Sequence, residues 1–313
     1  MNIIGRRKIW FTLSSILVTA SVIAMIIFGF RTGIDFAGGT LIEIEVGDID
    51  AGLLPENVGL ENYLESAYLE TTGEETVAQP SGPATTLVDD AGKKVSGTRW
   101  IFKSKIITND QKNAWIEAIS ETLPKLSELR FEIVSPAIGA EVVNKAIFAV
   151  ALAVIAILLY VAFSFRRVPR PTSSWRFSLA AIAALAHDVI ILLGAYAVMG
   201  YFFGAEVDGM FIVALLTLLG FSVHDTIVTF DRLRENLIKR GGSEFEKTVN
   251  DSVVETVTRS LNTSVTLIFV LLAMVLMGGS TITFFTLALL VGVAIGTYSS
   301  IFVAAPLLLL GRK

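Results

Sequence analysis

The sequence contains no cysteine, only two histidines and few charged side chains. The lack of cysteine excludes disulfides, thiol nucleophiles and cysteine-ligated metals, and it leaves the redox compartment open. Charged residues make up 17% of the chain, against about 25% in a typical soluble domain. The formal net charge of -4 points to no nucleic-acid partner. Hydrophobic residues reach 53% and the mean hydropathy is +0.67, a composition typical of a membrane protein.

Several motifs of catalysis are also missing. The chain has no phosphate-binding glycine-rich loop, no histidine-rich metal cluster and no nucleophile–base pair at a useful spacing. We therefore expect no ATP hydrolysis, no enzymatic activity, no metal and no bound cofactor.

The N-terminus resembles a signal peptide at first sight, because Arg6, Arg7 and Lys8 precede an apolar run. That run, Ile9–Phe30, has 22 residues, whereas the apolar region of a signal peptide has about 7–15. No Ala-x-Ala site lies near Phe30. The segment is therefore predicted to be a retained transmembrane anchor.

Long apolar runs recur along the chain. A bilayer core of about 30 Å requires about 20 apolar residues in helical conformation. Six segments meet this requirement: Ile9–Phe30, Ala146–Phe165, Phe177–Gly200, Met210–Phe230, Ser260–Met277 and Ile282–Leu310, with Pro306 in the last turn. The sequence predicts six transmembrane helices.

The loops between these segments differ in basic charge, and this difference predicts the orientation. The short loops 201–209 and 278–281 carry no lysine or arginine. Basic residues gather in the other short loops and at both ends: Arg6, Arg7, Lys8, Arg166, Arg167, Arg170, Arg176, Arg232, Arg234, Lys239, Arg240, Lys247, Arg312 and Lys313. By the positive-inside rule the basic loops and both termini are cytoplasmic. We expect an N-terminal segment with the first span (1–30), an extracytoplasmic domain (31–142) and a five-helix bundle (143–313) with a cytoplasmic loop at 231–259.

The pattern of the extracytoplasmic domain is α+β. In Leu41–Val46, three apolar residues alternate with Glu43 and Glu45, which predicts a half-exposed strand. The remaining expected elements are a helix at 56–70, weak strands at 71–79 and 85–88 interrupted by Pro80, Gly82 and Pro83, a strand at 99–106, a helix at 109–126 capped by Asn109 or Asp110, and a strand at 130–134. This order fits a β-α-β-β-α-β ferredoxin-like unit.

Ionisable side chains inside the spans are the candidate functional groups, because a charge at mid-bilayer costs about 2.5–3.5 kcal/mol. His187 and Asp188 lie in the third span, with Asp188 about 16 Å from its cytoplasmic end at 1.5 Å per residue. His224 and Asp225 lie in the cytoplasmic third of the fourth span. Arg259 begins the fifth span at a similar depth.

These groups suggest a proton pathway. A carboxylate in a low dielectric prefers to be protonated unless a cation is near, so Asp225 would bind a proton with Arg259 withdrawn and release it with Arg259 close. His187 and His224 titrate near neutral pH and could relay protons. The alternatives are a structural Asp–Arg pair that bridges two helices and histidines that hydrogen-bond backbone carbonyls. The combination of four titratable groups with Arg259 favours a function.

Gly292-x-x-x-Gly296 in the sixth span permits close helix packing. We interpret this motif as structural.

Several segments together resemble the SecF family of bacterial protein-export membrane subunits. Arg31–Thr40 is similar to the family's Gly-Ile-Asp-Phe-x-Gly-Gly-Thr signature, with Gly33, Asp35, Phe36, Gly38 and Gly39 in place. The other matching segments follow in the family's order: His187-Asp188, Val223–Thr226, Asp231–Asn236, Arg259–Ser264 and Gly296–Ser300. The resemblance covers nearly the whole chain except for roughly 50–97.

The resemblance implies half of an RND-type transporter bundle, located in the bacterial cytoplasmic membrane. It implies SecD as the heterodimeric partner, association with the SecYEG channel, SecA as the upstream motor, and a translocating preprotein as the cargo, with the proton-motive force as the energy source. The family's pathway carboxylate and arginine correspond to Asp225 and Arg259, and a further essential aspartate belongs to SecD. His224 replaces the asparagine of many members. The signature glycines suit either a hinge or a tight, rigid turn.

Two other functions compete with this interpretation. One is a proton-coupled exporter of the RND type that carries a small molecule or lipid, although one outer domain of about 110 residues is small for that role. The other is a purely structural translocon subunit, which the intramembrane titratable groups disfavour.

Overall fold

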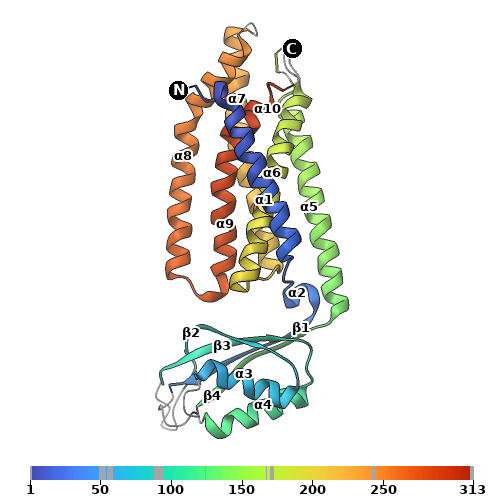
Figure 1. Cartoon of the computed structure of the whole chain (residues 1–313), viewed down its shortest axis with the longest axis vertical. Helices are drawn as coiled ribbons and strands as arrows, with labels where there is room; N and C mark the ends of the chain where they lie inside the picture. Colours follow the sequence, from blue (N-terminus) through green and yellow to red (C-terminus); the bar gives the residue numbers. More distant parts are fainter. Residues whose placement is uncertain are drawn as a thin grey trace. The chain divides into compact units, whose positions relative to one another are not determined.

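The chain divides into two compact units in the computed structural model, which describes residues 2–48, 54, 59–87, 95–123, 125–166, 168–169, 173–241 and 244–310 (Figure 1). The helical unit comprises Met1–Arg31, Ala146–Met277 and Phe284–Lys313. The α+β unit comprises Thr32–Lys145 and Gly278–Thr283.

The helical unit consists of long apolar helices, and six helices of the described part of the chain have the length and hydropathy to cross a membrane. The prediction of six spans is confirmed. A short helix η1 (Ile4–Arg6) leads into the first of them. The elements are α1 (Arg7–Phe28), α5 (Pro136–Ser164), α6 (Ser174–Phe203), α7 (Gly209–Arg240), α8 (Phe245–Met277), α9 (Ser280–Ser299), the π-helical segment η2 (Ser300–Ala304) and α10 (Ala305–Leu307).

Four of these helices, α5, α6, α7 and α8, are longer than the predicted spans. α5 begins at Pro136 rather than near Ala146, α7 extends past its apolar run to Arg240, and α8 begins at Phe245, well before its apolar run. The hydropathy pattern marks only the apolar part of a helix, so polar helical extensions were missed or shortened. The sixth span also departs from expectation, because it changes to π-helical geometry at Ser300 before Pro306 is reached.

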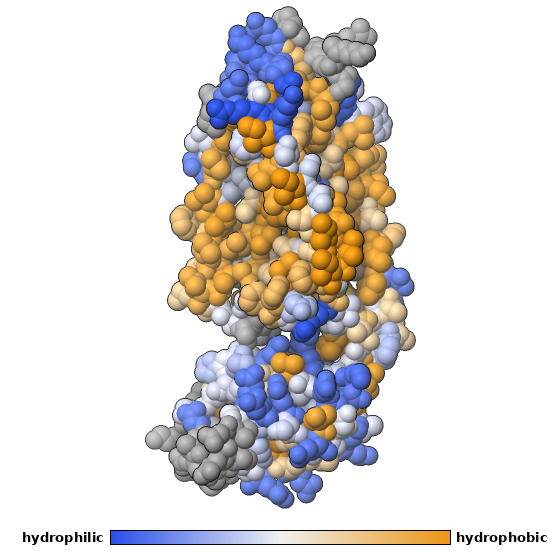
Figure 2. All heavy atoms as spheres, viewed as in Figure 1, coloured by the Kyte–Doolittle hydropathy of each residue, from blue (hydrophilic) through white to orange (hydrophobic). Residues whose placement is uncertain are grey.

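The centre of the helical unit is formed by α6, α7 and α9, whose apolar stretches are half buried or more. α1, α5 and α8 expose most of their apolar side chains, and a broad hydrophobic surface results (Figure 2). Polar residues gather at the end where α7 and α8 meet (Figure 2). This distribution is that of a bundle with an outer surface adapted to lipid or to further apolar protein.

Small residues allow the central helices to approach one another closely. A Cβ atom on Gly194 of α6 would lie 2.3 Å from Cβ of Ser21 on α1. On α9, a Cβ on Gly292 would meet Leu218 at 3.1 Å, and a Cβ on Gly296 would meet Ser222 at 3.1 Å. The Gly292-x-x-x-Gly296 motif therefore packs α9 against α7, as interpreted from the sequence.

The α+β unit has the predicted β-α-β-β-α-β order. Its elements, after a short α2 (Ile34–Ala37), are β1 (Gly39–Gly47), α3 (Leu60–Thr72), β2 (Val77–Pro83), β3 (Gly97–Ser104), α4 (Asn109–Thr122) and β4 (Leu126–Val134). The strand order is β2-β3-β1-β4, and all three pairings are antiparallel. This is the ferredoxin-like arrangement, and the fold prediction is confirmed.

An aromatic cluster joins the two helices to the sheet. Tyr68 of α3, Phe102 of β3 and Trp115 of α4 are almost fully buried, with Trp115 placed edge-on to the other two rings at centroid distances of 5.1 and 4.8 Å. Ile42 and Ile44 of β1 complete the core beneath them. The alternation of β1 thus correctly predicted which side chains face the core.

Several boundaries and details in this unit differ from the prediction. Thr108, rather than Asn109 or Asp110, caps α4, because Thr108 and Gln111 form a reciprocal capping box that outweighs single-residue preference. The residues at 71–72 belong to α3. β2 continues through Pro80 and Gly82 instead of ending there, since it is an edge strand with a register shift between these two residues. Thr85–Leu87 form no strand, and Val88 and residues 56–58 lie outside the described residues.

Glu45 is the clearest error in the sequence prediction. The alternation placed it on the half-exposed face, but it is 0% exposed. Its carboxylate accepts hydrogen bonds from the backbone N–H and hydroxyl groups of Thr85 and Thr86 and from Nη2 of Arg99, at 2.5–3.1 Å. Burial alone would raise the pKa of Glu45, but these hydrogen bonds outweigh it and lower the pKa to about 2. A loop distant in sequence therefore covers this face of β1.

Candidate functional site

Asp188 lies at the centre of the helical unit, on α6, with no exposed surface. Its Oδ1 lies 2.9 Å from Nδ1 of the neighbouring His187. Its Oδ2 accepts hydrogen bonds from Ser222 of α7 at 2.6 Å and from Ser299 at the end of α9 at 2.7 Å. One carboxylate thus contacts three helices.

His187 contacts the carboxylate of Asp188, not a backbone carbonyl. The ring is 7% exposed, and it lies near Tyr298 with the ring centroids 6.1 Å apart. Nε2 is buried, and among the described residues it has no hydrogen-bond partner. Because Nδ1 is occupied by Asp188, Nε2 is the ring nitrogen left for another partner.

Asp225 occupies a second polar site, on α7, and is 7% exposed. Its Oδ1 accepts a hydrogen bond from Ser260 of α8 at 2.6 Å, and its Oδ2 accepts one from Ser300 of η2 at 2.6 Å. Ser264 and Thr297 extend this polar seam between α8 and α9 with a 2.5 Å hydrogen bond. The sequence placed Asp225 correctly in the bundle but did not identify these hydroxyl partners.

Arg259 and Asp225 do not form an ion pair here. Arg259 is exposed, and within the described part of the chain it makes no salt bridge, although it directly precedes Ser260. It lines a cavity of about 630 Å³ bounded by α5, α7 and α8, together with Thr256, Glu255 and Tyr160. The interpretation of the two residues as a static bridge between helices is therefore not supported in this conformation.

His224 is also directed away from the two carboxylates, since it is exposed on the surface of α7. Of the five candidate residues in the spans, the structure buries His187, Asp188 and Asp225, exposes His224 on the surface of α7, and leaves Arg259 exposed in the cavity between α5, α7 and α8. A charged side chain on the apolar surface of a span is costly unless another protein or water covers it.

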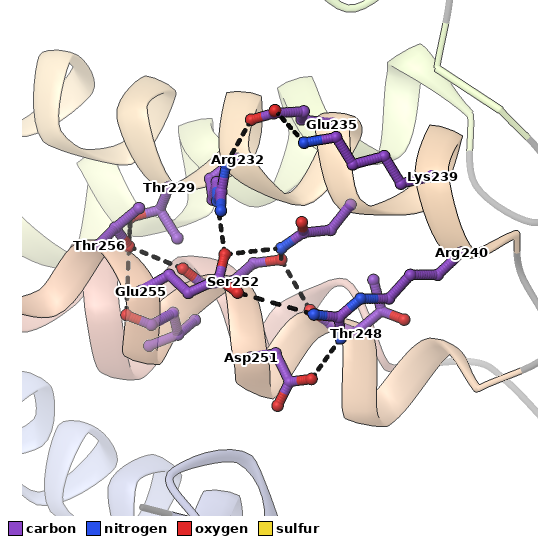
Figure 3. A network of polar contacts seen from close by, with 12 residues as sticks. Thr229, Arg232, Glu235, Lys239, Arg240, Thr248, Asp251, Ser252, Glu255 and Thr256 are labelled. Atoms are coloured by element: carbon purple, nitrogen blue, oxygen red, sulfur yellow. Dashed lines mark hydrogen bonds and ion pairs between the residues drawn. The ribbon is translucent and has the colours of Figure 1, made fainter.

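The polar extensions of α7 and α8 are joined by a set of side-chain contacts that we name the α7–α8 clasp (Figure 3). Nε of Arg232 lies 2.5 Å from Oε2 of Glu255, and Arg240 pairs with Asp251. Asn236 donates to Ser252 at 2.9 Å and to Glu255 at 3.0 Å. The clasp holds the helix of Asp225 in a fixed register with the helix of Arg259.

The glycine signature forms a tight turn. Gly38 ends α2 with φ of 77°, a conformation that favours glycine. A Cβ on Gly38 would lie 2.8 Å from the backbone N of Pro136, and a Cβ on Gly139 would lie 2.4 Å from the carbonyl O of Phe36. The turn is thus packed closely against the start of α5, which accords with a rigid turn. Gly33 and Gly39 are buried beside it, and Asp35 lies in α2.

The residues that sequence reasoning missed are the four serines that hold the carboxylates. Each is a polar residue in an apolar span, a property that many other serines and threonines share. Ser260, Ser299 and Ser300 also lie in the segments that resemble the SecF family, and this was the signal that could have found them. Within the described residues, no three His, Asp or Glu side chains gather into a group suited to a metal ion.

Comparison with known proteins gives the family. Residues 115–313 match the C-terminal family of the protein export membrane proteins SecD/SecF, and residues 23–48 match the SecD/SecF GG motif. The translocase subunit SecF of Thermobaculum terrenum is 40% identical, over 98% of this chain and 93% of that protein.

Relatives also exist in which the similar region is part of a longer chain. The translocase subunit SecDF of Bacillus subtilis is 33% identical over 96% of this chain, and the matched region is 37% of that protein. The crystal structure of SecDF from Thermus thermophilus is 30% identical, with a TM-score of 0.76 over 99% of this chain, and this chain spans only 38% of it. The chain belongs to the SecD/SecF family of protein-export membrane proteins.

Proposed function

We propose that this protein is the SecF subunit of a SecD–SecF complex and that it uses the proton-motive force to assist preprotein translocation. The full-length similarity to SecF proteins supports the role in protein translocation. The SecDF relatives, in which this region continues a longer chain, support SecD as the partner. We place the complex in the cytoplasmic membrane, where it assists the SecYEG channel after SecA has acted.

One observation carries the proton coupling. Asp225 is buried and bonded to hydroxyl groups, while Arg259, which precedes its partner Ser260 in the chain, is exposed and makes no ion pair within the described residues. A carboxylate without a cation in a low dielectric favours its protonated form. Approach of Arg259 would favour release of the proton from Asp225. A transport cycle could therefore bind and release a proton by changing the distance between Asp225 and Arg259.

An exposed ionisable side chain within a span supports a partner subunit packed against the helical unit. His224 is exposed on α7 within an apolar span, where burial against another subunit is favoured over exposure to lipid. SecD is the subunit proposed to cover it and to contribute a further carboxylate to the pathway. The basic N-terminal segment lies against the start of α8, where Arg7 pairs with Glu246 and the backbone N–H of Ile3 donates to Asn250. This supports cytoplasmic placement of the N-terminus together with the basic loop between α7 and α8.

The test is Asp225→Asn in the SecD–SecF complex. We expect the variant to insert and to pair with SecD, because the amide retains the shape of the carboxyl group, and to lose the stimulation of preprotein export by the proton-motive force. Glu244→Gln is the matched control, since Glu244 is an exposed carboxylate paired with Lys247 at the α7–α8 turn. Normal stimulation in Asp225→Asn would refute the proton role.

An RND-type exporter is the alternative function. It predicts transport of a small molecule or lipid that does not require the Sec channel. Depletion of SecYEG distinguishes the two functions, because it abolishes the effect of a translocation subunit and leaves an exporter active.

A further inference from the structure

Two adjacent serines bind two different intramembrane carboxylates. Ser299 donates to Oδ2 of Asp188 at 2.7 Å, and Ser300 donates to Oδ2 of Asp225 at 2.6 Å. Both serines are 0% exposed. The junction of α9 and η2 is therefore the one segment of the described chain that contacts both carboxylates through consecutive residues.

The geometry of the junction explains how this is achieved. Successive residues of a helix are rotated by about 100°, so neighbouring serines face different helices. The π-helical segment begins at Ser300 and packs against both α6 and α7. π-helical turns inside α-helices often occur at functional sites. The close approach at Gly296, whose added Cβ would lie 3.1 Å from Ser222, packs α9 against α7 beside Ser222, which itself donates to Asp188.

Each serine also has a second acceptor for its single hydroxyl proton. Ser299 Oγ lies 3.1 Å from the carbonyl O of Gly296, and Ser300 Oγ lies 2.9 Å from the carbonyl O of Thr297. Of the two contacts that each serine makes, the one to the carboxylate is the shorter. A hydroxyl that donates to an ionised carboxylate can turn to its own helix backbone once the carboxylate is protonated.

We propose that Ser299 and Ser300 couple Asp188 to Asp225, so that the two carboxylates exchange protons as one unit rather than independently. Protonation of either carboxylate changes the hydrogen bonding of the α9–η2 junction, and the junction passes that change to the other. Ser222 reinforces the coupling. It donates to Asp188 and lies on α7, the helix of Asp225, one turn before that residue. The two serines are positioning residues that act through the carboxylates.

The other titratable groups near this unit are few. His187 contacts Asp188 directly, and Tyr298 lies beside His187 and hydrogen-bonds Ser14 of α1. Arg259 on α8 and His224 on α7 are exposed. The coupling of Asp188 to Asp225 depends only on the hydrogen bonds inside the helical unit. Its use in protein export rests on the proposed function.

Infrared difference spectroscopy of the SecD-bound protein in proteoliposomes tests the coupling. Asp188→Asn and Asp225→Asn assign the carboxyl bands, and pH titration gives the midpoint for each. We expect Asp188→Asn to shift the midpoint of Asp225 by about one pH unit or more, the range of coupled sites. In the Ser299→Ala/Ser300→Ala background this shift should disappear.

Controls separate coupling from a general loss of packing. Ser178→Ala removes a buried hydroxyl of α6 that, among the described residues, bonds only to Ser174 of its own helix, so it should leave the shift intact. Ser300→Thr retains the hydroxyl and should retain the shift. If the double variant does not fold, Ser299→Ala alone must reduce the shift.

An Asp225 midpoint that does not respond to Asp188→Asn, or a shift that persists in the double variant, would overturn the proposal. If the bands are uncoupled while export still depends on Asp225, this inference fails alone. If the coupling is present while Asp225→Asn exports normally, the proposed function fails alone.

Discussion

Replacement of Glu45 by glutamine tests the buried charge of the α+β unit. The carboxylate is fully buried and accepts hydrogen bonds from Thr85, Thr86 and Arg99. Glutamine removes the charge and presents an NH₂ group where one carboxylate oxygen had accepted. The donors to that oxygen, which include a backbone N–H and a threonine hydroxyl, are left without an acceptor.

The pKa gives the magnitude. The hydrogen bonds lower the pKa of Glu45 from its ordinary value of 4.5 to about 2, and a tenfold change in proton affinity corresponds to about 1.4 kcal/mol. The ionised form is thus favoured by about 3 kcal/mol on folding. Because the folded pKa is the lower one, this contribution is present above about pH 4.5 and is lost as the pH falls toward 2. For Glu45→Gln we expect the free energy of unfolding of the α+β unit to fall by about 2–3 kcal/mol.

Hydrogen exchange of the full-length protein is the assay. The amides of β1 should exchange roughly 30- to 150-fold faster in Glu45→Gln at neutral pH, if exchange follows the opening equilibrium. Glu43→Gln is the matched control, because Glu43 lies on the same strand and its carboxylate is 3.5 Å from Nε of Arg99. It should change exchange by less than about tenfold. Equal protection of β1 in both variants at neutral pH would refute the reasoning.

Two further predictions concern packing and the clasp. Gly139→Ala should lower the Tm of the SecD-bound protein, because the added methyl would lie 2.4 Å from the carbonyl O of Phe36; Gly220→Ala, which meets nothing within 4 Å, should not lower it. An unchanged Tm for Gly139→Ala would contradict the tight turn. Glu255→Gln should weaken the α7–α8 clasp by about 1 kcal/mol at low salt and by less at high salt, since its partners Arg232 and Arg240 are partly exposed. The Tm of Glu255→Gln is compared with that of the unchanged protein at low and at high salt. The same Tm difference at both salt concentrations would contradict an electrostatic clasp.

The sequence alone determined the membrane architecture and the α+β fold. Hydropathy located all six spans, because lipid requires long apolar helices, and alternation identified Ile42 and Ile44 as core residues. The pattern also marked Asp188 and Asp225, because ionisable residues in apolar spans stand out against their neighbours. These signals are local, and each can be read from a window of the chain.

Only the tertiary structure decided the partners of those residues. Asp225 is held by Ser260 and Ser300 rather than by Arg259, and Glu45 is buried beneath a loop some forty residues away. Hydroxyl groups are frequent in transmembrane helices, and nothing local distinguishes a serine that meets a carboxylate from one that bonds its own backbone. The distinction depends on helix rotation and on close approach at glycines, both of which are set when the helices pack together.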